Sequence, residues 1–171
     1  EVTELRPLAG GEPTLLAEGL ADRATFSADD SVLAMAADGW IRLWHVTAER
    51  GVGRESVHRL SEPSTIGALA LSPDGTYLAA SSGGEILLWR VKSDGQPTGT
   101  LHPVAREPVD APGQRVSQIL FSPDGKVVAT AGSSGRVTIL LTAASAAERT
   151  HRKRTLALPS AAEHLAFSRD S

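Results

Sequence analysis

Two aspartates occupy the same place in a repeated turn, and a pair of carboxylates could do acid–base chemistry. Asp74 lies in the sequence Ser-Pro-Asp-Gly at 72–75, and Asp124 lies in the same sequence at 122–125. Glycoside hydrolysis uses two carboxyl groups placed around the scissile bond. The same sequence also suits a tight turn, because Pro presets φ, Asp bonds the local backbone and Gly accepts a positive φ. We therefore interpret both aspartates as turn residues.

Other candidate catalytic and metal-binding residues lack the spacing that their chemistry requires. The run Gly-Ser-Ser-Gly at 132–135 does not keep the Gly-x-Ser-x-Gly spacing of a nucleophile elbow, so we predict a hairpin turn there. The chain has no cysteine, which excludes a disulfide or a thiolate metal site. The histidines show none of the paired spacings of metal ligands: His45, His58, His102, His151 and His164. We predict no catalytic residue, no cofactor and no metal.

One basic cluster and one tryptophan could instead bind a partner. The cluster is the one dense group of charges, and its residues are Arg149, Arg152, Lys153 and Arg154. Such a run can hold phosphates or anionic lipid, but it lacks interleaved aromatic residues, so we expect a solvated loop and keep anion or nucleic-acid binding as an alternative. Trp40 follows the turn Asp38-Gly39, where its ring should point outward. Exposed tryptophans are enriched at binding hot spots.

These residues sit within a sequence that repeats. Four equivalent serines, Ser27, Ser72, Ser122 and Ser168, are spaced by 45, 50 and 46 residues. Between them the hydrophobic residues alternate with a period close to two, which indicates strands. A repeat of about 40 to 45 residues with several strands is typical of a β-propeller blade. We predict an all-β fold with about three and a half four-stranded blades.

The repeats also predict where the blades lie. We expect blades at residues 21–60, 66–104 and 116–158, with 1–20 ending a preceding blade and 162–171 starting a further one. The fourth strand of each blade is its least regular element, and we expect it at residues 56–60, 99–104 and 155–158. A propeller ring needs about four to eight blades, so we expect a fragment of a larger ring, or a half that another chain completes. Because terminal sheets expose apolar faces and strand edges, this segment alone should associate.

The composition is that of a globular protein, with 41% hydrophobic and 22% charged residues. The formal net charge of -3 is too small to steer the chain toward nucleic acid or membrane. No apolar run approaches the roughly 20 residues of a membrane helix. The lack of cysteine agrees with a reducing compartment, and we expect a cytoplasmic protein.

In this alignment the chain resembles the WD40 repeat family. The Phe-Ser-Pro-Asp-Gly part of the family pattern is intact at 121–125 and differs by one residue at 71–75. The turn aspartate of the pattern is matched by Asp38. Its tryptophan is matched by Trp44 and Trp89, whereas Leu140 replaces it in the third repeat. The aspartate that follows this tryptophan in the family is absent from all three repeats.

The resemblance implies a noncatalytic platform that binds protein through the loops on one face of a propeller. We expect the binding residues on this face to be Arg23, Asp38, Trp40, Arg115 and Arg136. The remaining blades would be supplied in cis or from another chain. The style of the repeats is similar to that of scaffold or sensor modules in large bacterial signalling or defence proteins. The alternative is part of an enzymatic propeller whose catalytic residues lie outside this segment.

Overall fold

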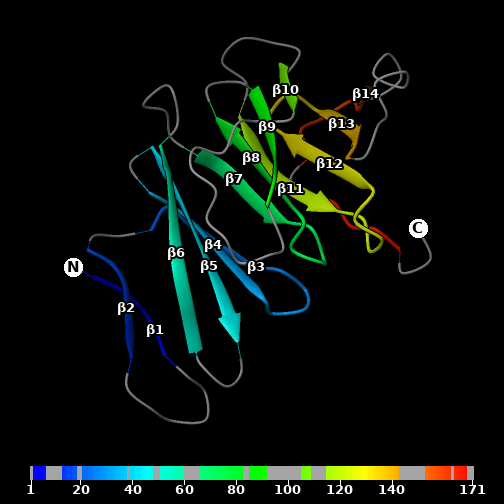
Figure 1. Ribbon diagram of the computed structural model, residues 1–171. Helices are drawn as coiled ribbons and strands as arrows, with labels where there is room; N and C mark the ends of the chain where they lie inside the picture. Colours follow the sequence, from blue (N-terminus) through cyan, green and yellow to red (C-terminus); the bar gives the residue numbers. More distant parts are fainter. Residues whose placement is uncertain are drawn as a thin grey trace.

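The computed structural model describes residues 2–6, 13–18, 21–37, 39–47, 51–59, 66–82, 85–91, 105–108, 115–142, 153–162 and 164–168. Every regular element within these residues is a β-strand. Three four-stranded antiparallel sheets follow one another along the chain and lie in a row (Figure 1). The prediction of an all-β fold built from four-stranded antiparallel sheets is confirmed.

Each sheet takes its strands in sequence order from the innermost to the outermost. The first sheet contains β3 Arg23–Phe26, β4 Val32–Ala37, β5 Trp40–Thr47 and β6 Gly51–Arg59. The second contains β7 Ile66–Leu71, β8 Tyr77–Ser82, β9 Glu85–Arg90 and β10 Ala105–Pro108. The third contains β11 Val116–Phe121, β12 Val127–Gly132, β13 Arg136–Leu141 and β14 Lys153–Ala157.

Smaller pieces of structure lie before the first sheet and after the third. A two-stranded antiparallel sheet of β1 Val2–Leu5 and β2 Thr14–Glu18 precedes the first sheet. Residues 164–168, which follow the third sheet, form no strand. The start of a further blade at 162–171 therefore stays a prediction.

The turns between the first and second strands are built by one hydrogen-bond pattern. In the third sheet the Ser122 Oγ donates to the Asp124 Oδ1 at 2.6 Å, and the Val127 N–H donates to the Ser122 Oγ at 3.0 Å. The same bonds join the equivalent residues of the other two turns. Gly125 has a φ of 70°, and Asp30 adopts 57° at the equivalent place in the first turn, which Asp tolerates better than most residues.

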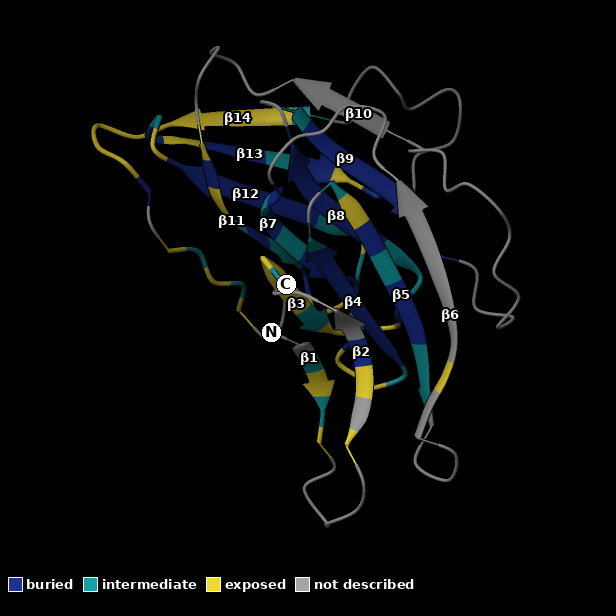
Figure 2. Cartoon of the chain, turned by 90° about the vertical axis from the view of Figure 1, so that its left-hand side faces the viewer, coloured by how far each residue is buried: buried dark blue, intermediate teal, exposed yellow. Residues whose placement is uncertain are grey.

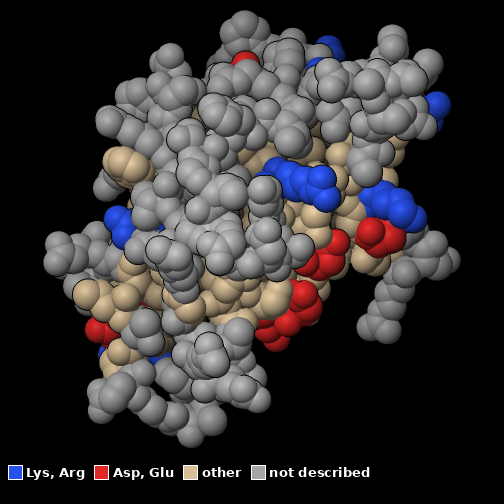
Figure 3. All heavy atoms as spheres, in the orientation of Figure 1, with Lys and Arg blue, Asp and Glu red and all other residues tan. Residues whose placement is uncertain are grey.

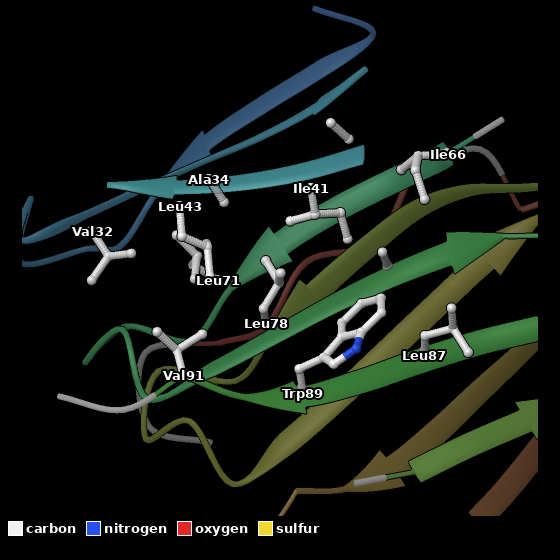
Figure 4. Close-up of a cluster of buried hydrophobic side chains, with 12 residues drawn as sticks. Val32, Ala34, Ile41, Leu43, Ile66, Leu71, Leu78, Leu87, Trp89 and Val91 are labelled. Atoms are coloured by element: carbon white, nitrogen blue, oxygen red, sulfur yellow. The ribbon is translucent and has the colours of Figure 1, made fainter. Parts of the chain in front are cut away.

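The core consists of layers between successive sheets. One layer joins the first and second sheets, and Figure 4 shows Trp89, Leu78 and Leu71 pointing from the second sheet toward the first. A second layer joins the second and third sheets through Ile86, Leu88, Val128 and others. The small residues of the second strands are buried, as the close approach of the sheets requires: Ala34, Ala36, Ala79, Ala80, Ala129 and Ala131. Figure 2 shows these middle strands as the buried part of the molecule and β14 as exposed.

The fourth strands differ most from the expectation. In the second sheet this strand is β10, whereas residues 99–104, which were predicted for it, lie outside the described residues. The sequence of β10, Ala-Arg-Glu-Pro, has no hydrophobic alternation, so the period-two pattern that indicates a strand is absent from it. Pro108 is tolerated because Pro is compatible with edge strands. In the first sheet β6 begins at Gly51, five residues before the predicted start at residue 56.

Candidate protein-binding face

Each sheet has two ends, and the predicted binding residues lie at one of them. We call it the Arg115 end: here the first strands begin and the second strands turn into the third. We call the opposite end the Asp124 end, and it contains the turns around Asp29, Asp74 and Asp124. The pairing of Arg23 with Ala36 and of Phe26 with Leu33 places these two sets of turns at opposite ends of the strands.

At the Arg115 end, Arg23 joins the first sheet to the second. Its Nε donates to the Gly67 carbonyl at 3.0 Å, and its Nη1 donates to the Asp22 carbonyl at 2.7 Å. Gly67 in turn lies against the third sheet, since a Cβ there would come within 2.8 Å of the Val116 carbonyl oxygen. The beginnings of the three innermost strands therefore converge. Arg23 is exposed, but its guanidinium already has a structural role between two sheets.

Arg115 is held at the same end by the turn of its own sheet. The Ser133 N–H donates to the Arg115 carbonyl at 3.0 Å, and the Arg115 N–H donates to the Ser133 Oγ at 3.3 Å. These reciprocal bonds fix the backbone while Arg115 as a residue remains exposed. Because Arg115 directly precedes Val116, it lies next to the junction of the innermost strands.

Arg136 and Trp40 begin the third strands at this end. The Arg136 N–H donates to the Ser134 Oγ at 3.1 Å, which closes the turn whose Gly135 has a φ of 69°. Trp40 is 37% exposed and pairs with Ala37. Because side chains alternate along β5, Trp40 lies on the same side of the sheet as Trp44. As the first residue of the strand, it lies at the rim of the sheet. Asp38, which was also predicted for this site, lies outside the described residues.

The Asp124 end is acidic. Figure 3 shows acidic side chains gathered over the β3–β4, β7–β8 and β11–β12 turns. Hydrogen bonds from Ser122 and then from Lys126 lower the pKa of Asp124 to about 2, and bonds from Ser27 and Ser31 lower the pKa of Asp29. At Asp74 partial burial acts in the opposite direction, but bonds from Ser72 and Thr76 still leave the pKa lowered. All three carboxylates are thus hydrogen-bonded within their own turns.

Only part of the predicted basic cluster can be placed. Arg149 and Arg152 lie outside the described residues, whereas Lys153 and Arg154 begin β14, so the prediction of a loop is wrong for these two residues. Lys153 pairs with Leu140 near the Asp124 end, and Arg154 is exposed. These two cations therefore lie toward the end opposite to Arg115.

Two further kinds of feature are absent from the part of the chain that the structure describes. Across the described ranges, no three His, Asp or Glu side chains gather as metal ligands. No helix long and apolar enough to cross a membrane occurs in those ranges either.

The shared turn network predicts acid-sensitive stability. Because the Asp124 pKa is about 2 in the folded protein and about 3.9 in an unfolded chain, the unfolded state takes up the proton first. The ionised Asp124 carboxylate therefore stabilises the folded state above about pH 4, and this stabilisation is lost as the pH falls toward about 2. We expect urea midpoints of the natural chain to fall over this range and those of Asp124→Asn to fall less. If the urea midpoints of the two proteins fall equally as the pH falls from about 4 to about 2, the Asp124 carboxylate does not stabilise the turn in this way.

Two contributors to this face were not recognised in the sequence. Gly67 matters because a side chain there would contact the Val116 carbonyl and the Ser81 Oγ. Gln118 matters because its Oε1 accepts a bond from the Leu165 N–H at 2.6 Å. A signal existed for Gln118, since it is the one long polar side chain in a strand whose other residues are apolar apart from Ser117. No local signal marked Gly67.

Comparison with protein families identifies two repeats. Residues 54–90 and 107–139 match the family model described as "WD domain, G-beta repeat". The "Protein LST8 homolog" of Drosophila melanogaster is 33% identical over 106 residues, which make up 60% of this chain and 31% of that protein. The chain thus spans about a third of the length of this curated relative.

Solved structures show the same arrangement of sheets. Hsv2 of Kluyveromyces lactis is 16% identical with a TM-score of 0.59, and the match covers 80% of this chain and 42% of that one. Sqt1 from Chaetomium thermophilum is 17% identical with a TM-score of 0.63, and the match covers 89% and 39% of the two chains. At such identities the likeness shows the fold alone.

Proposed function

We propose that this chain, which carries WD40 repeats and has the WD40-type β-propeller fold, serves as a noncatalytic platform that binds another protein through its Arg115 end. WD40 propellers generally mediate protein–protein interaction and are typically noncatalytic scaffolds. The resemblance found in the sequence is confirmed by the two matched repeats.

One observation carries the choice of face. The backbone of Arg115 is fixed by reciprocal bonds to the N–H and the Oγ of Ser133 at the point where the innermost strands converge. A rigid backbone that presents an exposed arginine is suited to recognition, because less conformational freedom is lost on binding. Trp40 and Arg136 begin third strands at the same end, and Trp and Arg are residue types enriched in hot spots.

The test is a variant in which Trp40, Arg115 and Arg136 are all replaced by Ala. We expect partner recovery from the native host, measured by quantitative mass spectrometry, to fall at least about tenfold while circular dichroism stays unchanged, because hot-spot residues carry most of the binding energy. The matched control neutralises Lys153 and Arg154 with Gln at the other end. It should leave recovery unchanged.

The opposite result would favour the anion-binding alternative. Unchanged recovery by the triple Ala variant, together with loss on neutralising Lys153 and Arg154, would contradict the proposed face. Binding that weakens steeply with added salt would then point to a polyanionic partner. The finer expectation of a scaffold or sensor within a larger bacterial signalling or defence protein, acting in the cytoplasm, stays a proposal that the complete reading frame would test.

A further inference from the structure

The basic cluster found in the sequence has no part in the proposed binding face. Its last three residues, the run Arg-Lys-Arg at 152–154, stand directly before Thr155, and the chain contains no other run of three basic residues. Charge patterns around the acceptor residue are one basis on which protein kinases select their substrates. The hydroxyl of Thr155 therefore has the sequence context of a phosphorylation site, and its place in the fold decides whether a kinase can reach it.

Thr155 lies in the middle of β14, the outermost strand of the third sheet. Residues 154–157 are all exposed, and Figure 2 shows this strand in the colour of exposed residues. Within the described residues, β14 pairs only with β13. A five-residue strand that buries so little of its surface separates from its neighbour at a small cost in free energy. The Thr155 hydroxyl is therefore accessible to the active site of a kinase.

Strand pairing places two cations on the same side of the sheet as Thr155. Thr155 pairs with Thr138, and two residues away Lys153 pairs with Leu140. Leu140 packs against the second sheet, and Arg136 lies on the same side because side chains alternate along β13. Lys153 is about 7 Å from Thr155 along β14. Arg136 lies diagonally across the strand pair, at about 7 to 8 Å. Both cations are long enough to meet a group attached to the Thr155 Oγ1.

Arg154 lies on the opposite side of the same sheet. It pairs with Ile139, which packs against Leu165 rather than against the second sheet. Arg154 thus belongs to the basic run that precedes the acceptor but lies away from the Thr155 side chain. Arg136 has the reverse combination, because it lies near Thr155 in space but outside the run. The two arginines therefore separate recognition by a kinase from contact with the phosphate.

We propose that Thr155 is a phosphorylation site for a Ser/Thr kinase that selects basic sequences, and that Lys153 and Arg136 hold the resulting phosphate. In the reaction the Thr155 Oγ1 attacks the γ-phosphorus of ATP. The new Oγ1–P bond forms while the bond from the γ-phosphorus to the β–γ bridging oxygen breaks, and ADP leaves. The hydroxyl proton passes to the catalytic carboxylate of the kinase.

The phosphate fastens the outermost strand to its neighbour. It carries a charge of about −1.5 to −2 at neutral pH and three strong acceptor oxygens. The Lys153 ammonium and the Arg136 guanidinium donate charge-assisted hydrogen bonds to these oxygens. Because Arg136 belongs to β13 and Thr155 to β14, the new bonds join the two strands. Phosphorylation therefore makes β14 open less often.

The test uses the protein as its host makes it, purified and treated with phosphatase. It is then incubated with ATP, Mg²⁺ and the catalytic subunit of cAMP-dependent protein kinase, which selects acceptors preceded by basic residues. Tandem mass spectrometry should find the phosphate on Thr155. Arg154→Gln should lower the rate of phosphorylation about tenfold or more, because it removes a charge that the kinase recognises. The matched control is Arg90→Gln, which replaces an exposed arginine at the end of β9 and should leave the rate at Thr155 unchanged.

Hydrogen exchange measured by mass spectrometry tests which groups hold the phosphate. We expect the amides of residues 154–157 to exchange at least about threefold more slowly after phosphorylation, because exchange requires the strand to open. Arg136→Gln should abolish this slowing and leave the phosphorylation rate unchanged. Arg154→Gln should have the opposite pair of effects, with slow phosphorylation but full slowing of exchange once the phosphate is present.

Each half of the proposal has its own contrary result. A protein that takes up no phosphate on Thr155, or equal rates for Arg154→Gln and Arg90→Gln, would overturn the assignment of the phosphorylation site. Exchange that is unchanged or faster after phosphorylation would show that the phosphate does not fasten β14 to β13. Slowing that persists in Arg136→Gln would overturn the role of Arg136.

Discussion

Replacing Trp89 by Ala is expected to lower the free energy of unfolding by about 3 to 5 kcal/mol, the usual cost of truncating a large buried aromatic side chain. Trp89 is 3% exposed and belongs to the layer between the first and second sheets (Figure 4). Its removal would leave a cavity against Leu78, with which it pairs. The change should appear as a lower midpoint in urea denaturation followed by circular dichroism.

Two further variants show whether the effect depends on burial. Trp40→Ala should change the stability by no more than about 0.5 kcal/mol, as is usual for surface positions, because Trp40 is partly exposed at a sheet rim. Trp89→Leu should cost less than Trp89→Ala, since Leu140 occupies the equivalent place in the third sheet and is buried there. Equal destabilisation by Trp40→Ala and Trp89→Ala would show that Trp40 contributes to the core.

Gly132→Ala is expected to destabilise the protein by up to about 3 kcal/mol, at the upper end of overpacking effects. A Cβ at this position would collide with the Arg115 carbonyl oxygen and would lie 2.9 Å from the Arg115 carbonyl carbon and 3.0 Å from the Val116 Cα. All three atoms belong to the backbone. They cannot move without breaking the bonds between Arg115 and Ser133.

The matched control for this prediction is Ser82→Ala. Ser82 occupies the repeat position of Gly132 in the second sheet, where a side chain is already accommodated and buried. We expect Ser82→Ala to cost about 1 kcal/mol, the usual value for one hydrogen bond. If Gly132→Ala is no more destabilising than Ser82→Ala, then β11 moves away from β12 more easily than this packing implies.

The fold could be predicted because its signals are local and repeated. The alternation of apolar residues indicates strands that are buried on one or both sides. The Ser-x-Asp sequences indicate the turns that join the first and second strands of each sheet. Ser122 and Asp124 show why the turn sequence is so regular, since their side chains bond each other and the local backbone. The fourth strands gave no such signal. In β10 the strand is defined by its pairing with β9 rather than by its own sequence.

The candidate site was predictable only in outline. The sequence placed Arg23, Trp40, Arg115 and Arg136 at one end of the sheets, and strand pairing places them there. It could not show that the Arg23 guanidinium is bound to Gly67 of the next sheet. That contact joins residues 44 positions apart and depends on how two sheets are oriented. A repeat pattern along the chain carries no information about that orientation.

The amino-acid sequence by itself determined the repeat, the strand order within each sheet and the chemistry of the turns, because these depend on neighbours a few residues away. The tertiary structure decided which copies of a repeated position are buried and which are exposed. Phe26, Leu71 and Phe121 are equivalent in the repeat, yet among the described residues only Phe26 lacks a complete sheet against it. Likewise Gly132 and Ser82 occupy equivalent positions of the repeat, but at Gly132 the backbone of Arg115 lies too close to leave room for a Cβ. Burial and close approach are properties of the space between sheets, and a repeat that looks uniform along the chain is not uniform in that space.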